Sequence, residues 1–332
     1  METSAGRQLI PHARTVLVLL LLEIALTLGG HAEAQLQPAR KITMSYSAVS
    51  MTWLPIKVAL ERGFFREEGL EPQLVQMRGN IVTPALASGD VDFSLNISPI
   101  LNGAIQGMGL KLVTVLNTRP LFSLVVRPEI KSPADLKGKV FAVNAFANSQ
   151  AILTEKHLQH FGLKKGEYKL IAVGGTGERW SVMERNLAQG SLMPPPANVK
   201  MEEMGYRLMG NTAEIITHPI VGLGTREDKI KKQPELVLKT IRAALKGLQF
   251  VWSNRPETVK IIMRWVNLNE AEAIRVYDLS KVGFGKNGYA SDDDLSIEWE
   301  FIQQETKRAH VPVSVARDFA LLGDAQRELG IR

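Results

Sequence analysis

The segment from residue 54 to residue 99 constrains the fold more than any other, because it predicts two strand–loop–helix units in series. A helix is predicted to begin at Pro55, whose fixed φ suits a first helical turn. Buried strands are predicted over residues 72–77 and 91–95, and the helix between them is predicted to begin at Thr83. Helices then follow the carboxyl ends of strands, which is the edge where open α/β sheets bind ligands.

The same segment contains a series of short motifs. A helix that ends in Gly-Phe-Phe is followed by Glu-Glu-Gly-Leu-Glu, by a strand, and then by Ala-Leu-Ala-Ser-Gly-Asp-Val-Asp-Phe. In this order they resemble the periplasmic solute-binding proteins of ABC importers. More narrowly, they resemble the branch that binds aliphatic sulfonates, taurine, nitrate and thiamine pyrimidine precursors. The resemblance covers residues 40–328 and is weakest over residues 190–215.

This resemblance implies an α/β fold of the two-lobed type II periplasmic binding protein arrangement, with mixed sheets flanked by helices and a hinge of two crossing connections. Lobe 1 is expected to comprise residues 36–121 and 222–332, and lobe 2 residues 122–221. A small-molecule ligand would bridge the lobes and favour a closed state. That state would dock on the transmembrane permease subunits of an ABC transporter with their ATPase. The resemblance implies a protein that works as a monomer.

One segment departs from the family pattern. The family has a glycine, a strand with an acidic residue and alanine, and then a loop with proline. Here Gly190 is followed by three residues and then at once by Pro194-Pro195-Pro196. Proline cannot donate ladder hydrogen bonds in a central strand. We therefore expect a strand of lobe 2 to be shortened or lost over residues 190–196, together with the ligand contacts from that edge.

Residues 1–34 have the features of an export signal. Arg7 and Arg14 precede a mostly apolar run over residues 15–28, and Ala32-Glu33-Ala34 fits a cleavage site. The alternative is a membrane anchor, but the apolar run is shorter than the roughly 20 residues that a spanning helix needs. The chain has no cysteine, which excludes a lipid-modified cysteine after the signal. A freely diffusing periplasmic protein is therefore predicted.

The charge balance is basic. Removing residues 1–34 takes away two of 40 basic and three of 34 acidic side chains, which leaves 38 and 31 and a net charge of +7. This balance suits the capture of anions or approach to an acidic partner. The densest basic cluster is Lys229, Lys231 and Lys232, which is typical of a solvated helix face and does not indicate nucleic acid binding.

Polar side chains are expected at the ends of the predicted strands, where a ligand would lie. Asn96 ends a strand and Ser98 begins a helix, although capping alone accounts for that serine. Trp53 fits a core position as well as a ligand-stacking one, and a structural role is the alternative for His218. The expected ligand-binding residues are Ser47, Ser50, Trp53, Asn80, Asn96, Ser98, Asn117, Asn148, Ser149, Gly175 and His218. Together they predict a cleft of neutral donors without a dedicated arginine, in which helix N-termini meet the ligand's charge.

No cofactor, metal site or catalytic centre is predicted. The turn Gly174-Gly175-Thr176-Gly177 lacks the lysine of a P-loop. His157 and His160 share a helix face, but no third ligand stands nearby. The rival to a transport protein is an enzyme on the same fold, a thiamine-pyrimidine synthase, which would carry a cysteine-rich motif. A second rival is a sensor or binding relative without a transport role. The predicted ligand is small and either anionic or heteroaromatic.

Overall fold

The computed structural model describes residues 38–47, 49–77, 79–144, 146, 149–308 and 311–331, without the side chains of residues 79, 80 and 149. The predicted N-terminal signal lies outside the described residues. Within the described ranges, no helix combines the length and the apolar character needed to cross a membrane.

The first of two mixed sheets has five strands in the order β2-β1-β3-β10-β4. β1 pairs in parallel with β2 and β3, whereas β10 pairs antiparallel with β3 and β4. In this register Met44 lies opposite both Leu74 and Phe93, so apolar side chains meet across the sheet. The strands are β1 (Arg40–Tyr46), β2 (Leu70–Gln76), β3 (Phe93–Asn96), β4 (Leu110–Asn117) and β10 (Val221–Arg226).

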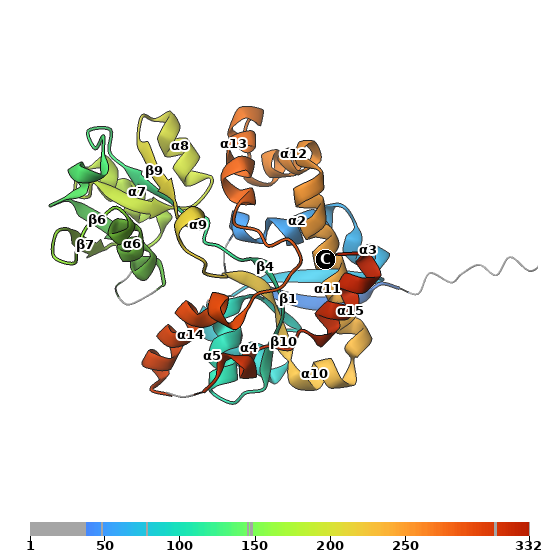
Figure 1. Ribbon diagram of the computed structural model, residues 1–332. Helices are drawn as coiled ribbons and strands as arrows, with labels where there is room; N and C mark the ends of the chain where they lie inside the picture. The colour runs from blue at the N-terminus through green and yellow to red at the C-terminus, as the bar shows by residue number, and fades with distance from the viewer. Residues whose placement is uncertain are drawn as a thin grey trace, which may run out of the picture. The chain divides into compact units, whose positions relative to one another are not determined.

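The second sheet repeats this arrangement in the order β7-β6-β8-β5-β9. β6 pairs in parallel with β7 and β8, and β5 pairs antiparallel with β8 and β9. The chain passes to the second sheet between β4 and β5 and returns between β9 and β10 (Figure 1). The strands are β5 (Ser123–Val126), β6 (Val140–Val143), β7 (Lys169–Ala172), β8 (Gly190–Met193) and β9 (Arg207–Asn211).

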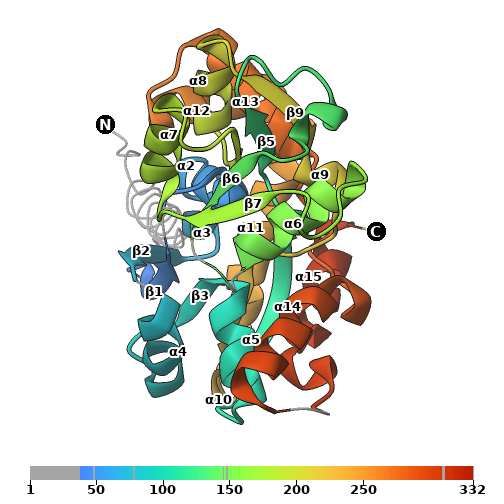
Figure 2. The same ribbon diagram turned by 90° about the vertical axis from the view of Figure 1, so that its left-hand side faces the viewer.

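Helices cover both faces of the first sheet. On one face α2 and α11 enclose the largest apolar core together with α12 and α13, and on the other α4, α5 and α14 enclose a separate core (Figure 2). Gly247 lets α11 approach α2 closely, because a Cβ there would meet the Pro55 carbonyl oxygen. The helices are α2 (Leu54–Glu61), α3 (Phe64–Glu67), α4 (Gly79–Ser88), α5 (Ile97–Ile105), α10 (Glu227–Lys232), α11 (Pro234–Ser253), α12 (Arg255–Val266), α13 (Glu270–Lys281), α14 (Asp292–Thr306) and α15 (Ala320–Leu329).

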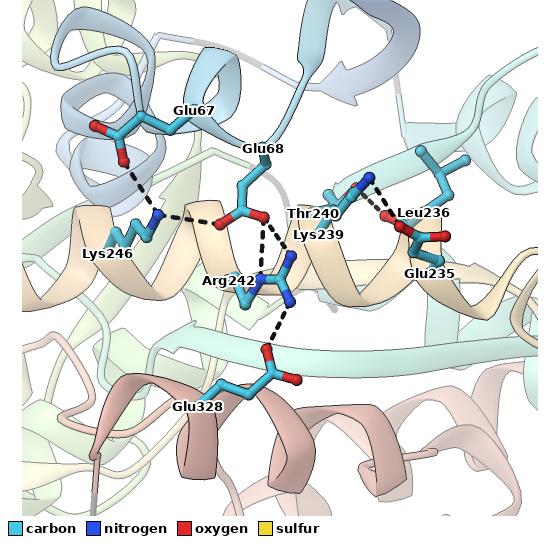
Figure 3. Close-up of polar contacts among 9 residues, drawn as sticks. All are labelled: Glu67, Glu68, Glu235, Leu236, Lys239, Thr240, Arg242, Lys246 and Glu328. Atoms are coloured by element: carbon cyan, nitrogen blue, oxygen red, sulfur yellow. Dashed lines mark hydrogen bonds and ion pairs between the residues drawn. The ribbon is translucent and has the colours of Figure 1, made fainter. Parts of the chain in front are cut away.

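A charge network joins three of these helices (Figure 3). Arg242 of α11 donates to the Glu68 carboxylate after α3 and to Glu328 of α15, and Lys246 bonds both Glu67 and Glu68 at 3.0 Å. Burial would raise the pKa of the Glu68 carboxyl, but the bonds from Arg242 and Lys246 outweigh it and lower the pKa below its ordinary value. The network therefore fastens the outer helices to α11.

The central strands of the second sheet are apolar on both faces, as expected for strands covered on two sides. Leu124 and Leu192 face one core with α6, whereas Val125 and Met193 face another with α7 and α8. These cores are smaller than the largest core of the first sheet. The helices are α6 (Ser149–His160), α7 (Thr176–Glu184), α8 (Ala197–Glu203) and α9 (Thr212–Ile215), and three short 3₁₀ turns are η1 (Met51–Trp53), η2 (Pro133–Leu136) and η3 (Val313–Ala316).

Two expectations need correction. The strand that the prolines were expected to shorten or remove is present as β8, which pairs with β5 at four positions and with β6 at two. The prolines at 194–196 come after its last residue, so none of them has to donate to the ladder. The helix expected to begin at Thr83 begins at Gly79, and Val82 in the added turn is fully buried.

Candidate functional site

A cavity of about 410 Å³ lies among the carboxyl ends of strands from both sheets and the two segments that connect the sheets. We call the first sheet with its helices the first half of the molecule, and the second sheet with its helices the second half. Two larger hollows of about 570 and 510 Å³ are each lined by residues of the first half alone. The cavity is therefore the candidate site, and its volume is typical of small-ligand pockets, at about 300–1,000 Å³. Its lining consists of Tyr46, Ser47, Val49, Ser50, Thr52, Trp53, Leu95, Asn96, Leu121, Phe122, Asn144, Gln150, Gly175, Thr176, Arg179, Pro194, Pro195, Ile220 and Val221.

The first sheet contributes hydroxyl and amide groups at the ends of β1 and β3. The Asn96 Nδ2 donates to the Ser47 Oγ at 3.1 Å, which joins the ends of the two strands. The Ser50 Oγ accepts from the Thr52 Oγ1 at 3.0 Å and from the Thr52 N–H, so it caps η1. These bonds fix the polar rim of the first half before any ligand arrives.

Aromatic rings from both halves also line the cavity. Trp53 is 5% exposed, and its ring packs edge-on against Trp265 at 4.7 Å and beside Tyr46 at 5.2 Å between centroids. Phe122 adds a third ring from the segment that leads into β5. Trp53 and Tyr46 are anchored in the largest core, whereas Phe122 packs against a core of the second sheet. Together the three rings give the cavity an apolar wall.

The second sheet contributes a different set of groups. Gly175 and Thr176 begin α7, and no side chain caps this helix, so its first N–H groups remain available at the positive end of the helix dipole. Gln150 of α6 is buried, and its Oε1 accepts from the Asn144 N–H at 3.0 Å. Pro194 and Pro195 follow β8 and form an apolar rim.

Arg179 of α7 is the charged side chain of this lining, and no lining residue within the described ranges is acidic. It is 4% exposed, and its Nη1 donates to the Gly174 carbonyl at 2.9 Å and its Nη2 to the Thr176 Oγ1 at 3.3 Å. The Nε has no hydrogen-bond partner. Burial lowers the pKa of the Arg179 guanidinium, and the nearby charge of Glu178 opposes that effect.

Five of the predicted site residues line the cavity, three lie elsewhere, and three cannot be placed by their side chains. The Ser98 hydroxyl donates to Glu298, the Asn117 Nδ2 donates to the Gly283 carbonyl at 3.0 Å, and the His218 Nε2 lies 3.3 Å from Glu298. The residues in the lining are Ser47, Ser50, Trp53, Asn96 and Gly175. The residues whose side chains lie outside the described part are Asn80, Asn148 and Ser149. The ligand-binding role of all eleven stays a prediction.

Sequence reasoning missed Arg179, Gln150 and Phe122. It expected a cleft without a dedicated arginine, and the position of Arg179 in the lining corrects that expectation. A usable signal was present, because Arg179 follows Thr176 by three residues and so shares its helix face at the start of α7.

Histidines and acidic residues form no metal site here: within the described part of the chain, no three such side chains come together with metal-binding geometry. His157 is fully buried, with its Nε2 2.9 Å from the Met209 carbonyl and its Nδ1 3.3 Å from the Thr212 Oγ1. Burial lowers its pKa to about 4. His157 therefore ties α6 to β9 and α9 as a neutral group.

Comparisons with known proteins place these features among relatives. A family model described as NMT1/THI5-like matches residues 51–258. A Haemophilus influenzae protein named for thiamine biosynthesis is 32% identical over 124 residues, which span 36% of this chain and 38% of that relative. The riboflavin-binding protein RibY of Chloroflexus aurantiacus is 22% identical over 236 residues, which span 68% of this chain and 67% of RibY.

Solved structures share the fold at low identity. The sulfonate-binding protein SsuA of Methylobacillus flagellatus superposes with a TM-score of 0.69 at 17% identity, over 89% of this chain and 96% of SsuA. The nitrate-binding protein NrtA of Synechocystis gives 0.62 at 14%, over 88% and 89%. The desulfurization enzyme DszB gives 0.64 at 14%, over 87% and 99%. These likenesses confirm the predicted two-lobed α/β fold of periplasmic binding proteins.

Proposed function

The chain belongs to the NMT1/THI5-like family, and we propose that it is the periplasmic substrate-binding component of an ABC transporter. It captures a small anionic or heteroaromatic solute in the cavity and delivers it to a membrane permease. The observation that carries this proposal is the cavity itself, which is lined by the carboxyl ends of strands from both sheets. A ligand there touches both halves of the protein at once.

The proposal includes a hinge. Lobe 1 comprises residues 36–121 and 222–332, lobe 2 comprises residues 122–221, and the crossing connections lie near Leu121 and Val221. Both of these residues line the cavity, so a change in the crossing angle changes the cavity directly. A ligand drives closure only if it binds the closed form better than the open form. Contacts from both sheets to one small molecule supply that difference.

Export and docking complete the proposal. The protein acts in the periplasm as a monomer after removal of residues 1–34, and its closed state docks on the permease and its ATPase. The structural relatives that are binding components of import systems support this assignment. The net positive charge of the chain supports capture of an anionic solute.

We propose further that the protein binds its ligand without transforming it. The fold also supports catalysis, since DszB is an enzyme. A thiamine-pyrimidine synthase of the kind that resembles this branch carries a cysteine-rich motif, and this chain has no cysteine. A non-transport sensor would share the cavity, and only a missing permease partner would favour it.

The test is a ligand screen on protein produced from the full-length coding sequence. Thermal unfolding is followed with alkanesulfonates, nitrate, aromatic carboxylates and sulfonates, aminopyrimidines and riboflavin. A ligand at 100 times its Kd stabilises the protein by about 2.7 kcal/mol and raises the melting temperature by mass action. We expect at least one compound to bind at micromolar Kd, about −8 kcal/mol, and to be recovered unchanged. A melting temperature that no compound moves, or chemical conversion of the bound compound, contradicts the proposal.

A further inference from the structure

The cavity contains a buried cation that forms no ion pair within the described residues. Arg179 is 4% exposed, and within the described part of the chain it forms no ion pair. A guanidinium has five N–H donors, and its two hydrogen bonds, to the Gly174 carbonyl and the Thr176 hydroxyl, use neutral acceptors. The Nε is left without a partner.

Burying an unpaired guanidinium lowers the stability of the folded protein. A buried charge is normally paired, and an unpaired one is a strong destabilising element. The Thr176 and Gly174 bonds hold the guanidinium in place but do not neutralise it. The nearest acidic side chain along the helix, Glu178, is exposed and forms no ion pair with Arg179 in the described residues. Glu178 acts on the guanidinium through its charge alone, so an ion pair with Arg179 requires an anion that enters the cavity.

The start of helix α7 is a second feature that favours an anion near Arg179. The start of α7 at Gly175 and Thr176 lies in the cavity wall, and no side chain caps it. Backbone N–H groups at a helix start bind anions. Arg179 lies on the same face of α7, so the guanidinium and the helix start act on one group.

The apolar residues of the lining indicate what the rest of the ligand is. Tyr46, Trp53 and Phe122 line the cavity with aromatic rings, and Pro194 and Pro195 line it from the second sheet. Because no acidic residue is present in the described lining, no side chain there can form an ion pair with a cationic group on the ligand. These aromatic and proline side chains favour an aromatic ring as the apolar part of the ligand.

We propose that Arg179 is the anion-holding residue of this cavity and that the solute is an aromatic monoanion, a planar ring that carries one carboxylate or sulfonate. The oxyanion takes the free edge of the Arg179 guanidinium and the first N–H groups of α7. The ring lies against Trp53 and Tyr46. This inference rests on the proposed function and narrows its substrate class.

The test compares matched ligands on the unmodified protein by isothermal titration calorimetry. Benzoate is paired with benzamide and benzenesulfonate with benzenesulfonamide, and methanesulfonate and 4-aminopyrimidine represent the anion without a ring and the ring without a charge. We expect each aromatic anion to bind at least about tenfold more tightly than its neutral partner and than methanesulfonate. Equal affinity within each pair overturns the inference.

A matched pair of variants locates the effect. Arg179→Gln is expected to weaken benzoate binding by at least about tenfold and to leave benzamide binding unchanged within twofold, because only the anion uses the charge. Arg185→Gln removes the same charge from the exposed end of α7, where Arg185 bonds Ser181, and is expected to change neither affinity. An equal loss for benzoate and benzamide in Arg179→Gln, or an equal effect of Arg185→Gln, overturns the role of Arg179.

The outcomes separate this inference from the proposed function. Binding of 4-aminopyrimidine or methanesulfonate alone overturns the aromatic monoanion and leaves the solute-binding function standing. Failure of all six compounds, while another compound of the wider screen binds, does the same. Failure of every compound in both experiments contradicts both proposals.

Discussion

The two sheets share one strand order and one pattern of directions, yet they bring opposite kinds of side chain to the cavity. The first sheet supplies aromatic rings and hydroxyl groups that are already bonded to one another. The second supplies a guanidinium and an uncapped helix start whose bonding is incomplete. The same topology thus builds one wall whose hydroxyl groups bond within the protein, with the Asn96 Oδ1 left over, and one wall whose guanidinium Nε has no partner.

The apolar cores of the two halves differ in size. The first sheet lies on the largest apolar cluster, in which α11 packs on α2. The second sheet has two smaller clusters, one on each face. Hydrophobic stabilisation scales with the apolar area that is buried. We infer that the first half supplies most of the stability and the second half most of the selectivity.

The largest expected effect comes from removing the aromatic anchor of the first half. Trp53→Ala deletes a side chain that is 5% exposed and packs on Trp265 and Tyr46. It should lower the free energy of unfolding by about 3–5 kcal/mol, measured by urea denaturation. Trp180→Ala is the matched change in the second half, where the ring is only partly buried, and should cost about 1–2 kcal/mol. Equal losses would break the comparison.

The next largest effect is the pH dependence of the free energy of unfolding, which should differ between the two halves. His157 is buried and neutral when folded, with its pKa lowered from 6.5 to about 4, so unfolding lets it bind a proton. Its contribution is complete above pH 6.5 and is lost as the pH falls toward 4, by up to about 3 kcal/mol at 1.36 kcal/mol per pKa unit. Unfolding free energy measured between pH 7 and 4 should fall less steeply in His157→Gln. The exposed control His160→Gln should keep the original slope.

The first half should respond to acid only at lower pH. The pKa of Glu68 is lowered by its bonds to Arg242 and Lys246, which outweigh the effect of burial. Its contribution is present above its ordinary value of 4.5 and is lost as the pH falls through the lower, folded value. Hydrogen exchange at pH 5 should therefore show opening of β9 and α6 before α11. Earlier opening of α11 would contradict this order.

A smaller effect tests how closely the helices of the first half pack. A Cβ at Gly247 would meet the Pro55 carbonyl oxygen, so Gly247→Ala should cost about 1–3 kcal/mol despite the better helix propensity of alanine. Nothing lies within 4 Å of a Cβ at Gly177 of α7. Gly177→Ala should be neutral or stabilising by up to about 1 kcal/mol. Urea denaturation of both variants measures the difference, and a loss at Gly177 comparable to that at Gly247 would contradict it.

The smallest expected effect concerns an ion pair that joins the two halves away from the cavity. Arg275 of α13 bonds Glu202 of α8 at 3.0 Å, and both side chains are substantially exposed. Arg275→Ala should change the free energy of unfolding by no more than about 1 kcal/mol. Ligand affinity should also stay within twofold in calorimetry. A large change in affinity would show that this pair, rather than the cavity, controls the hinge.

The sequence predicted the sheets better than the site because strands are local patterns. The strands predicted over residues 72–77 and 91–95 are present as β2 and β3, with bounds that differ by one or two residues. The ladder of β8 was misjudged because proline blocks only its own position, and all three prolines fall beyond Met193. Rules that read the sequence locally succeed where a residue's structure depends on residues close to it in the chain.

The site depends on neighbours that the chain brings from far away. Ser98 was expected at the ligand edge, but its hydroxyl bonds Glu298, 200 residues further along the chain. Arg179 was overlooked because an arginine on a helix is ordinarily solvated, and only its burial without a carboxylate partner makes it distinctive. The lack of a carboxylate partner for Arg179 is visible only in the folded structure, because no sequence pattern shows which side chains will meet.

The central claim, that one small solute draws the two halves together, has a direct test in a distance across the cavity. Gln76 and Ala172 are exposed at equivalent positions, the carboxyl ends of edge strands β2 and β7. Because the chain has no cysteine, Gln76→Cys and Ala172→Cys can be spin-labelled without background. Pulsed electron paramagnetic resonance should show the distance between the labels shorten when the tightest ligand of the screen saturates the protein. An unchanged distance distribution at saturation would contradict the account.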